Sequence, residues 1–273
     1  MKHAIVTFLK GLCIGGTMTV PGVSGGSMAM ILGIYDKIIF SLNNLLKKDK
    51  KSFLFLVECC LGAILGIVLF SKSVLNLLTA FPMPMKYFFI GAVAGGVPLI
   101  YKSAKLEKFS YKAILFPLLG FVLVILISLI PNGVFTTSSG VSGIIIQILG
   151  GVIVAAALVL PGISVSQMLL MLGLYETVMT GISTFNILPL IPLAIGVLLG
   201  TAATAKLMNN ALKSFPKITY LVILGFVLGS LKELFPGVPQ GREILTCLLT
   251  AAAGFFAIYT ISSGSLKSGD KSQ

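Results

Sequence analysis

The sequence predicts an all-α, polytopic membrane protein with two inverted-topology repeats. Each repeat is expected to contain a re-entrant helical hairpin, broken at Pro-Gly, and three transmembrane helices. Three observations lead to this fold: the composition, an internal repeat and an uneven distribution of lysine. The 273 residues are 56% hydrophobic and 10% charged, with a mean hydropathy of +1.06. Because soluble domains carry about 25% charged residues, we expect this chain to lie in a bilayer.

The internal repeat is visible as phrases that occur once in each half of the chain. Val20-Pro21-Gly22-Val23-Ser24 recurs as Leu160-Pro161-Gly162-Ile163-Ser164. At the same offset, Leu32-Gly33-Ile34-Tyr35-Asp36 recurs as Leu172-Gly173-Leu174-Tyr175-Glu176. At a slightly shorter offset, Gly62-x3-Gly66 and Gly91-x3-Gly95 recur as Gly196-x3-Gly200 and Gly225-x3-Gly229. We therefore expect one membrane domain made of a first repeat, 1–135, and a second repeat, 136–273.

Each repeat contains five apolar segments, at about 4–20, 22–46, 53–71, 85–101 and 113–130, and then at about 143–160, 162–180, 187–205, 218–235 and 244–261. A full span takes about 20 apolar residues. The first two segments of each repeat meet at Pro-Gly without a hydrophilic loop, which favours a hairpin that enters and leaves on one side. Two full spans are the alternative. The Gly-x3-Gly pairs are typical of helix-packing surfaces.

The lysines predict the orientation, because cytoplasmic loops carry an excess of basic residues. Five segments per repeat is an odd number, so the two repeats should have opposite orientations. With the N-terminus in the cytoplasm, 15 of the 20 basic residues lie inside. Those outside are Lys72, Lys86, Lys232 and Arg242, and Lys37 lies within the first hairpin. The sequence thus predicts a multi-pass protein of the cytoplasmic membrane with both termini inside, and a net charge of +12 that serves topology, not nucleic-acid binding.

The Pro-Gly phrases are the candidate binding site. Irregular backbone within a membrane is tolerated where it lines a cavity, and paired broken segments indicate a transporter's binding site. A helix start offers unpaired N–H groups and a positive dipole end to an anion, and glycine lets the backbone approach a ligand. A kink where helices pack is the alternative. The expected phosphate-binding residues are Pro21, Gly22, Ser24, Gly25, Gly26, Ser27, Pro161, Gly162, Ser164, Ser166 and Gln167.

Other charged residues are candidates for coupling and for attracting a head group. Glu58 lies in an apolar run and is the first choice for carrying a proton. Asp36 and Glu176, expected where the hairpin helices end, are the other two acids. Lys72 and Lys206 occupy matching positions and could attract an anionic head group at opposite faces. The sequence has no nucleotide-binding, metal-binding or catalytic motif, so we expect no metal, no cofactor and no enzymatic activity.

The Pro21–Ser27 and Leu32–Tyr35 segments, with Pro161–Ser164 and Leu172–Tyr175, resemble the prokaryotic polyprenyl-phosphate translocases over essentially the whole chain. The resemblance implies a protein that binds undecaprenyl phosphate and returns it from the outer to the inner leaflet for envelope biosynthesis. One departure is Val165-Ser166, where that family usually has Gly-Ser. A carrier or channel for a small anion or other solute is the alternative. A lipid phosphatase is disfavoured, because the sequence has one histidine, His3, and no acid cluster.

The predicted topology can be tested with cysteine variants in a background without native cysteines. A membrane-impermeant thiol reagent added to intact cells should label Ser138→Cys and Thr184→Cys, because both lie in loops without basic residues that are expected outside. It should not label Asp49→Cys, which lies among four lysines. Labelling of Asp49→Cys from outside would overturn the orientation.

Overall fold

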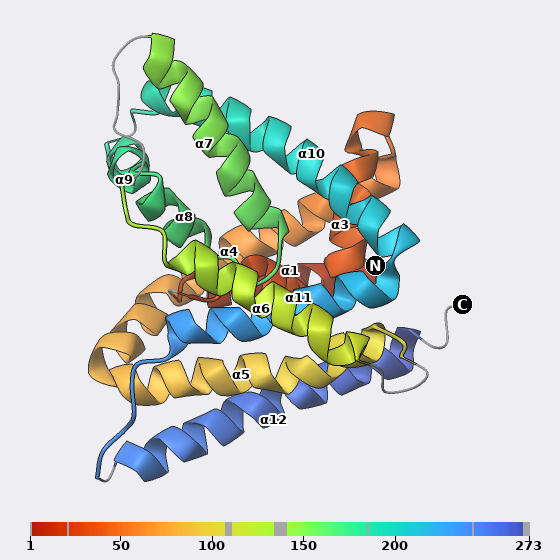
Figure 1. The fold of residues 1–273 in the computed structure, drawn as a ribbon, viewed down its shortest axis with the longest axis vertical. Helices are drawn as coiled ribbons and strands as arrows, with labels where there is room; N and C mark the ends of the chain where they lie inside the picture. The colour runs from red at the N-terminus through yellow and green to blue at the C-terminus, as the bar shows by residue number, and fades with distance from the viewer. Residues whose placement is uncertain are drawn as a thin grey trace.

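The computed structural model describes residues 2–20, 22–106, 111–133, 141–184, 186–241 and 243–269, and these residues form helices and connections without strands (Figure 1). Five helices are long and apolar enough to cross a membrane. They are α4 (Lys50–Ala80), α5 (Pro82–Ser103), α7 (Val141–Val159), α10 (Ile191–Ser214) and α12 (Glu243–Gly269). The protein is therefore a polytopic, all-helical membrane protein, as predicted.

The remaining helices are shorter or more charged. They are α1 (Lys2–Met18), α2 (Gly25–Ile31), α3 (Tyr35–Asn44), α6 (Lys112–Ser128), α8 (Val165–Met171), α9 (Tyr175–Ser183) and α11 (Pro216–Leu234), with 3-10 turns η1 (Leu45–Lys47) and η2 (Leu188–Leu190). Four of the six predicted spans are among the five long helices. Of the other two, α6 has only 17 residues, and α11 carries Lys217, Lys232 and Glu233 within 19 residues. Conversely α7, expected in a hairpin, is long enough to span.

The segment predicted as one helix over 22–46 is broken, and so is its counterpart in the second repeat. Helices α2 and α3 are bent by 117° relative to each other. Gly33 has a φ of 67° and its N–H donates to Met30, while the Ile34 N–H donates to Ala29. This is a Schellman cap, which ends a helix at a left-handed glycine. Gly173, with a φ of 68°, forms the same cap at the end of α8.

These caps correct the predicted positions of two acids. Asp36 and Glu176 were expected where the hairpin helices end, but they lie in the first turns of α3 and α9. The physical reason is the glycine three positions before each acid, which ends one helix and allows the next to begin. A carboxylate in the first turn of a helix is stabilised by the helix dipole.

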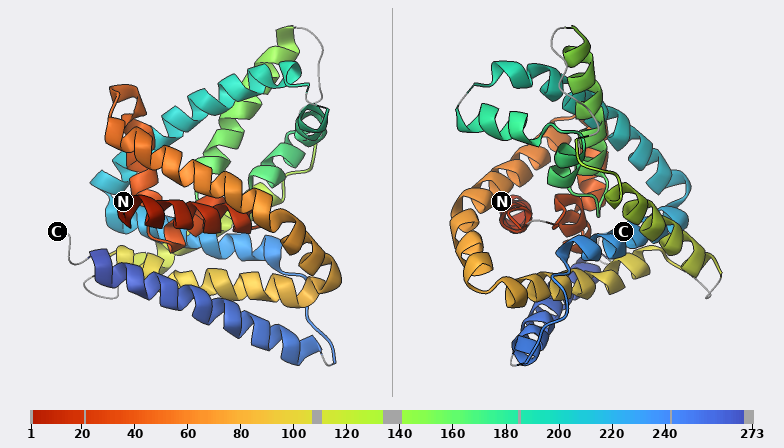
Figure 2. Two further views of the ribbon diagram at one scale, coloured as in Figure 1. Left: turned by 180° about the vertical axis from the view of Figure 1, so that it is seen from behind. Right: turned by 60° about the vertical axis from the view of Figure 1, so that its left-hand side comes forward.

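Among the described residues, the five long helices and α1, α6 and α11 pack in four close pairs. Within the repeats, α1 packs along α4 and α7 along α10, whereas α5 packs along α12 and α6 along α11 across the repeats (Figures 1 and 2). Matching helices run in opposite directions: α4 runs right to left in Figure 1 and α10 left to right. Helices α5 and α11 are likewise opposed, as are α6 and α12. Inverted repeats would produce this arrangement, and the division of the chain at about residue 135 stays a prediction.

Glycines make these pairs close, as the Gly-x3-Gly pattern predicted. A Cβ at Gly62 would collide with the Phe8 carbonyl oxygen on α1, and one at Gly66 with the Leu12 carbonyl. In the second repeat, a Cβ at Gly196 would collide with the Ile148 carbonyl on α7. Backbones in such contacts are held by van der Waals packing, which is the main attraction between helices in lipid.

Basic residues gather at one end of the molecule. The N-terminal end of α1 and the C-terminal end of α12 both lie at the right of Figure 1. At the same end, α4, α6 and α11 begin and α5 and α10 finish. The terminal turns found there carry Lys50, Lys51, Lys102, Lys112, Lys213 and Lys217. Beside them Asp49 caps α4, and a hydrogen bond of 2.6 Å from the Ser52 hydroxyl holds the pKa of Asp49 below its usual range.

We predict that Gly254→Ala weakens the α5–α12 pair. The added Cβ would meet the Phe88 carbonyl oxygen and would lie 2.9 Å from the Ala92 nitrogen. Overpacking of this kind costs about 1–3 kcal/mol, so the midpoint of thermal unfolding in detergent should fall. The matched control is Ala253→Leu, at the exposed neighbouring position on α12. Equal midpoints for Gly254→Ala and wild type would contradict the packing role.

Candidate functional site

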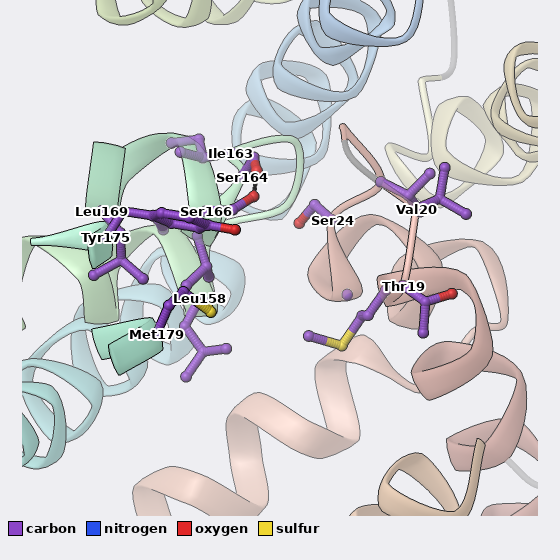
Figure 3. Close-up of a pocket in the computed structure, with 15 residues that line it drawn as sticks. Thr19, Val20, Ser24, Leu158, Ile163, Ser164, Ser166, Leu169, Tyr175 and Met179 are labelled. Carbon is purple, nitrogen blue, oxygen red and sulfur yellow. Dashed lines mark hydrogen bonds between the residues drawn. The ribbon is translucent and has the colours of Figure 1, made fainter. Parts of the chain in front are cut away.

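The two Pro-Gly motifs meet at one cavity. A cavity of about 330 Å³ is lined by Val20, Val23, Ser24 and Gly25 from the first motif and by Ile163–Ser166 from the second (Figure 3). The motifs also touch directly, because a Cβ on Gly26 would lie 3.1 Å from the Cα of Pro161. Two phrases far apart in the sequence are thus brought to one place, as the repeat predicted.

Glycine conformations explain the tight turns that lead into this cavity. Gly22 has a φ of 87° and Gly162 a φ of 83°, values that residues with a Cβ rarely adopt. Both turns lie against α11. A Cβ at Gly162 would collide with the Phe226 carbonyl, and one at Gly22 would lie 3.3 Å from the Glu233 carbonyl carbon. The second residue of each Pro-Gly dipeptide is therefore needed for the turn and for its packing.

Serine hydroxyls supply the polar surface of the cavity. Ser24 and Ser164 are the N-cap residues of α2 and α8, and both are extended and buried. The Ser164 hydroxyl accepts a 3.4 Å hydrogen bond from the Gln167 N–H and shares a 2.9 Å hydrogen bond with the Ser166 hydroxyl. The Ser24 hydroxyl makes no capping bond. Figure 3 shows Ser24 and the Ser164–Ser166 pair facing each other from opposite walls.

The predicted phosphate-binding residues divide into two groups. Ser24, Gly25, Ser164 and Ser166 line the cavity. The others that the structure describes contribute to the framework: Gly22 and Gly162 form the turns, Gly26 packs on Pro161, and the Gln167 N–H donates to the Ser164 cap of α8. Ser27 does not line the cavity, and its hydroxyl is buried without a partner in the described part of the chain. Pro21 lies outside the described residues.

The candidate coupling residues lie away from the cavity. Asp36 accepts a hydrogen bond from the Tyr220 hydroxyl on α11. Glu58 is half-buried on α4, and no hydrogen bond or ion pair to it occurs within the described ranges. Glu176 is exposed and lines a separate polar pocket of about 350 Å³ together with Thr177, Thr180 and Asn186. No three His, Cys, Asp or Glu side chains gather into a metal site among the residues that are described.

The two lysines proposed for head-group attraction are exposed. Lys72 lies in the second half of α4 and Lys206 in the second half of α10, and neither lines the cavity. Because α4 and α10 run in opposite directions, these lysines lie toward opposite ends of the molecule (Figure 1). Attraction of an anionic head group by these two lysines, one at each face of the membrane, therefore stays a proposal.

Three residues contribute in ways that the sequence reasoning missed. Thr19 and Tyr175 line the cavity from opposite sides. Tyr175 belongs to a repeated phrase, so the repeat itself was a signal that it has a role. Lys10 is the third: its ammonium donates a 2.6 Å hydrogen bond to the carbonyl of Leu32, at the end of α2. The sequence carries no signal for Lys10, because the contact joins two helices whose relative position only the fold defines.

The fold and this cavity together define a class: polytopic helical membrane proteins with a small polar cavity between broken helices, the arrangement found in secondary transporters. The chain belongs to the undecaprenyl phosphate translocase-like family, whose profile matches residues 14–247. A polyprenyl-phosphate transporter of Staphylococcus aureus (strain NCTC 8325 / PS 47) is 35% identical over 94% of this chain and 95% of its own length. Another polyprenyl-phosphate transporter, of Vibrio cholerae serotype O1, is 29% identical over 84% of this chain and 77% of its own length. No solved structure matches.

Different capping at the two motifs predicts different stability effects. Ser164→Ala removes the cap of α8 and should lower the free energy of unfolding by about 0.5–2 kcal/mol. Ser24→Ala removes no capping bond and should change it by less than about 0.5 kcal/mol. Thermal unfolding of the two purified variants in the same detergent makes the comparison. A larger loss for Ser24→Ala than for Ser164→Ala would contradict the capping geometry.

Proposed function

We propose that this protein is a translocase that moves undecaprenyl phosphate, or a related polyprenyl phosphate, from the outer to the inner leaflet of the cytoplasmic membrane. There the lipid can accept another envelope precursor. The observation that carries the proposal is the convergence of both Pro-Gly motifs on one polar cavity. The names of the relatives supply the substrate class.

The cavity suits a phosphate monoester attached to an apolar chain. Hydroxyls of Ser24, Ser164 and Ser166 and the first N–H groups of α2 and α8 are donors for phosphate oxygens. No lysine or arginine is among the lining residues that the structure describes. Neutral donors hold an anion without placing a full positive charge in hydrocarbon, where such a charge is costly. Apolar residues complete the lining and can cover the first isoprenoid units; they include Met18, Leu158, Leu169 and Met179.

The proposed topology has two inverted repeats and both termini in the cytoplasm. Opposite directions of the matching helices support the inversion (Figure 1). The gathering of lysine-bearing helix ends at the end that also holds both termini supports the orientation, by the excess of basic residues in cytoplasmic loops. In such a fold, the two hairpins belong to two repeats that have opposite orientations in the membrane. The head-group site can therefore open to one side of the membrane and then to the other.

Transport without bond cleavage fits the cavity better than phosphatase chemistry. A phosphatase needs a nucleophile beside a general base or a metal. The cavity is lined by serine, threonine and tyrosine hydroxyls together with apolar side chains and glycine, and no His, Asp, Glu or Cys is among the described residues of its lining. Hydroxyls alone bind a phosphate but do not activate an attack on it.

The direction of transport sets an energetic requirement. Moving an anion inward against an inside-negative potential costs about 2.3 kcal/mol per charge per 100 mV. Carrying a proton with the lipid offsets part of that cost. Glu58, which has no partner among the described residues and lies on a helix long enough to span a membrane, is the first candidate to carry it, and Asp36 and Glu176 are the others.

The proposal predicts graded transport defects in proteoliposomes that contain a fluorescent polyprenyl phosphate. Ser24→Ala should slow transfer between leaflets about tenfold, because it removes one donor to a charged group. Gly25→Val should slow it further. A Cβ at Gly25 would lie 2.7 Å from the Met18 sulfur, so the added side chain displaces Met18 and fills the cavity.

The matched control is Ser103→Ala, whose hydroxyl donates within α5 to the Leu99 carbonyl and lies outside the cavity. Its transfer rate should equal that of wild type. Normal transfer by a correctly inserted Gly25→Val protein would contradict the phosphate site. Release of inorganic phosphate by the wild-type protein would instead support the phosphatase alternative.

A further inference from the structure

Two tyrosines that match in the repeat have different environments. Tyr35 is 2% exposed, and its hydroxyl donates a 2.9 Å hydrogen bond to the Val159 carbonyl, which ties α3 of the first repeat to α7 of the second. Tyr175, its counterpart, is half-buried and lines the 330 Å³ cavity. Within the described part of the chain, the Tyr175 hydroxyl makes no hydrogen bond.

The acceptors of this bond also match. Val159 corresponds to Thr19 at the same offset that relates the tyrosines. Val159 is the last residue of α7, and Thr19 directly follows α1. Both carbonyls therefore lie at helix ends, where oxygen atoms lack intrahelical partners. Figure 3 shows Thr19 and Tyr175 on opposite walls of the cavity. The contact that is closed at Tyr35 and Val159 is open at Tyr175 and Thr19.

A third matching pair shows the same asymmetry. Ile39 is 1% exposed, whereas its counterpart Met179 is 41% exposed. Ile39 lines a second, smaller cavity of about 240 Å³ together with Tyr35 and Val159. Met179 lines the larger cavity with Tyr175 and Thr19. The two cavities adjoin, since they share the residues Met18, Gly25 and Leu158. They are thus counterparts of each other under the repeat: the larger one is lined by serine and threonine as well as apolar side chains, and the smaller one mainly by apolar side chains.

We propose that Tyr35 and Tyr175 are alternating latches of the transport cycle. The hydrogen bond from Tyr35 to the Val159 carbonyl closes one side in the state seen here. In the opposite state, Tyr175 donates to the Thr19 carbonyl and closes the cavity, while Tyr35 releases Val159 and the cavity beside Ile39 opens. The identity of the transported molecule rests on the proposed function. The exchange of latches depends only on the two conformations.

The exchange of one hydrogen bond for its counterpart has an energetic advantage. A transporter must visit both states, so neither can be much more stable than the other. A tyrosine-to-carbonyl bond that breaks on one side and forms on the other leaves the number of bonds unchanged. Loss of one bond alone shifts such an equilibrium by about threefold to tenfold.

Cysteine accessibility can follow the two states. The reporters are Ile39→Cys and Met179→Cys, made separately in a background in which the four native cysteines are replaced. The purified full chain in lipid nanodiscs is treated with a charged thiol reagent, and the modification rate is measured without added substrate. In the otherwise unchanged protein, the Met179→Cys reporter should react faster, as the exposed fractions indicate.

The latch variants should move the reporters in opposite directions. Tyr35→Phe should slow modification at Met179→Cys and speed it at Ile39→Cys by about threefold to tenfold. Tyr175→Phe should do the reverse, and the double variant should return the ratio of rates toward wild type. Tyr87→Phe is the matched control, because the Tyr87 hydroxyl also donates to a backbone carbonyl, that of Gly237, away from both cavities.

Several results would overturn the proposal: no change with Tyr35→Phe, a change in the same direction at both reporters, or an equal response to Tyr87→Phe. Cross-linking is an independent measurement for variants that insert poorly. A short bifunctional thiol reagent should join Tyr175→Cys to Thr19→Cys only in the opposite state and should stop leaflet transfer. Failure to capture that pair under any condition contradicts the second latch.

These measurements separate the latch from the proposed function. If the reporters respond as expected but wild-type protein moves no polyprenyl phosphate, the latch stands and the substrate assignment fails. If wild-type protein moves the lipid and the reporters do not respond to either tyrosine variant, the function stands and the latch is wrong.

Discussion

Every backbone polar group that a membrane protein buries must find a partner within the protein, because hydrocarbon offers none. This chain breaks its apolar helices near two Pro-Gly motifs, and each break leaves N–H and carbonyl groups unpaired. The partners come from nearby. Schellman bonds around Gly33 and Gly173 satisfy the ends of α2 and α8, and the Lys10 ammonium supplies a further donor to Leu32. Tyr35 does the same for the end of α7. In the proposed phosphate site, the first N–H groups of α2 and α8 are the ones left for a ligand.

Much of this architecture is encoded in patterns that the sequence displays. Pro-Gly repeated in two apolar contexts predicted the breaks and a cavity beside them, because irregular backbone within a membrane is tolerated where it lines a cavity. The Gly-x3-Gly pairs predicted close helix contacts for a similar reason. The second break in each hairpin carried a signal too, in Gly33 and Gly173, but a lone glycine inside an apolar run is ambiguous. Only its positive φ and the bonds around it identify a cap.

Other features could not be read from the sequence. The two copies of a repeated phrase look equivalent in the sequence. The sequence does not indicate which copy of a contact is formed in a given conformation. Tyr35 and Tyr175 have similar neighbours in sequence, yet one is buried and the other lines the cavity. Likewise, Ser27 fits a phosphate-binding phrase but does not line the cavity. The rotation of each short helix decides which of its side chains reach the cavity, and that rotation depends on packing against other helices.

The contact between Gly26 and Pro161 has a consequence for how the two motifs can move. A Cβ on Gly26 would lie only 3.1 Å from the Cα of Pro161, so the motifs meet at their backbones. A side chain can yield to a neighbour by changing its rotamer, whereas backbone atoms held in a helix start or a tight turn cannot. A displacement of either motif at this contact therefore pushes on the other motif as a whole segment, as in the stiff, closely packed interior of a protein.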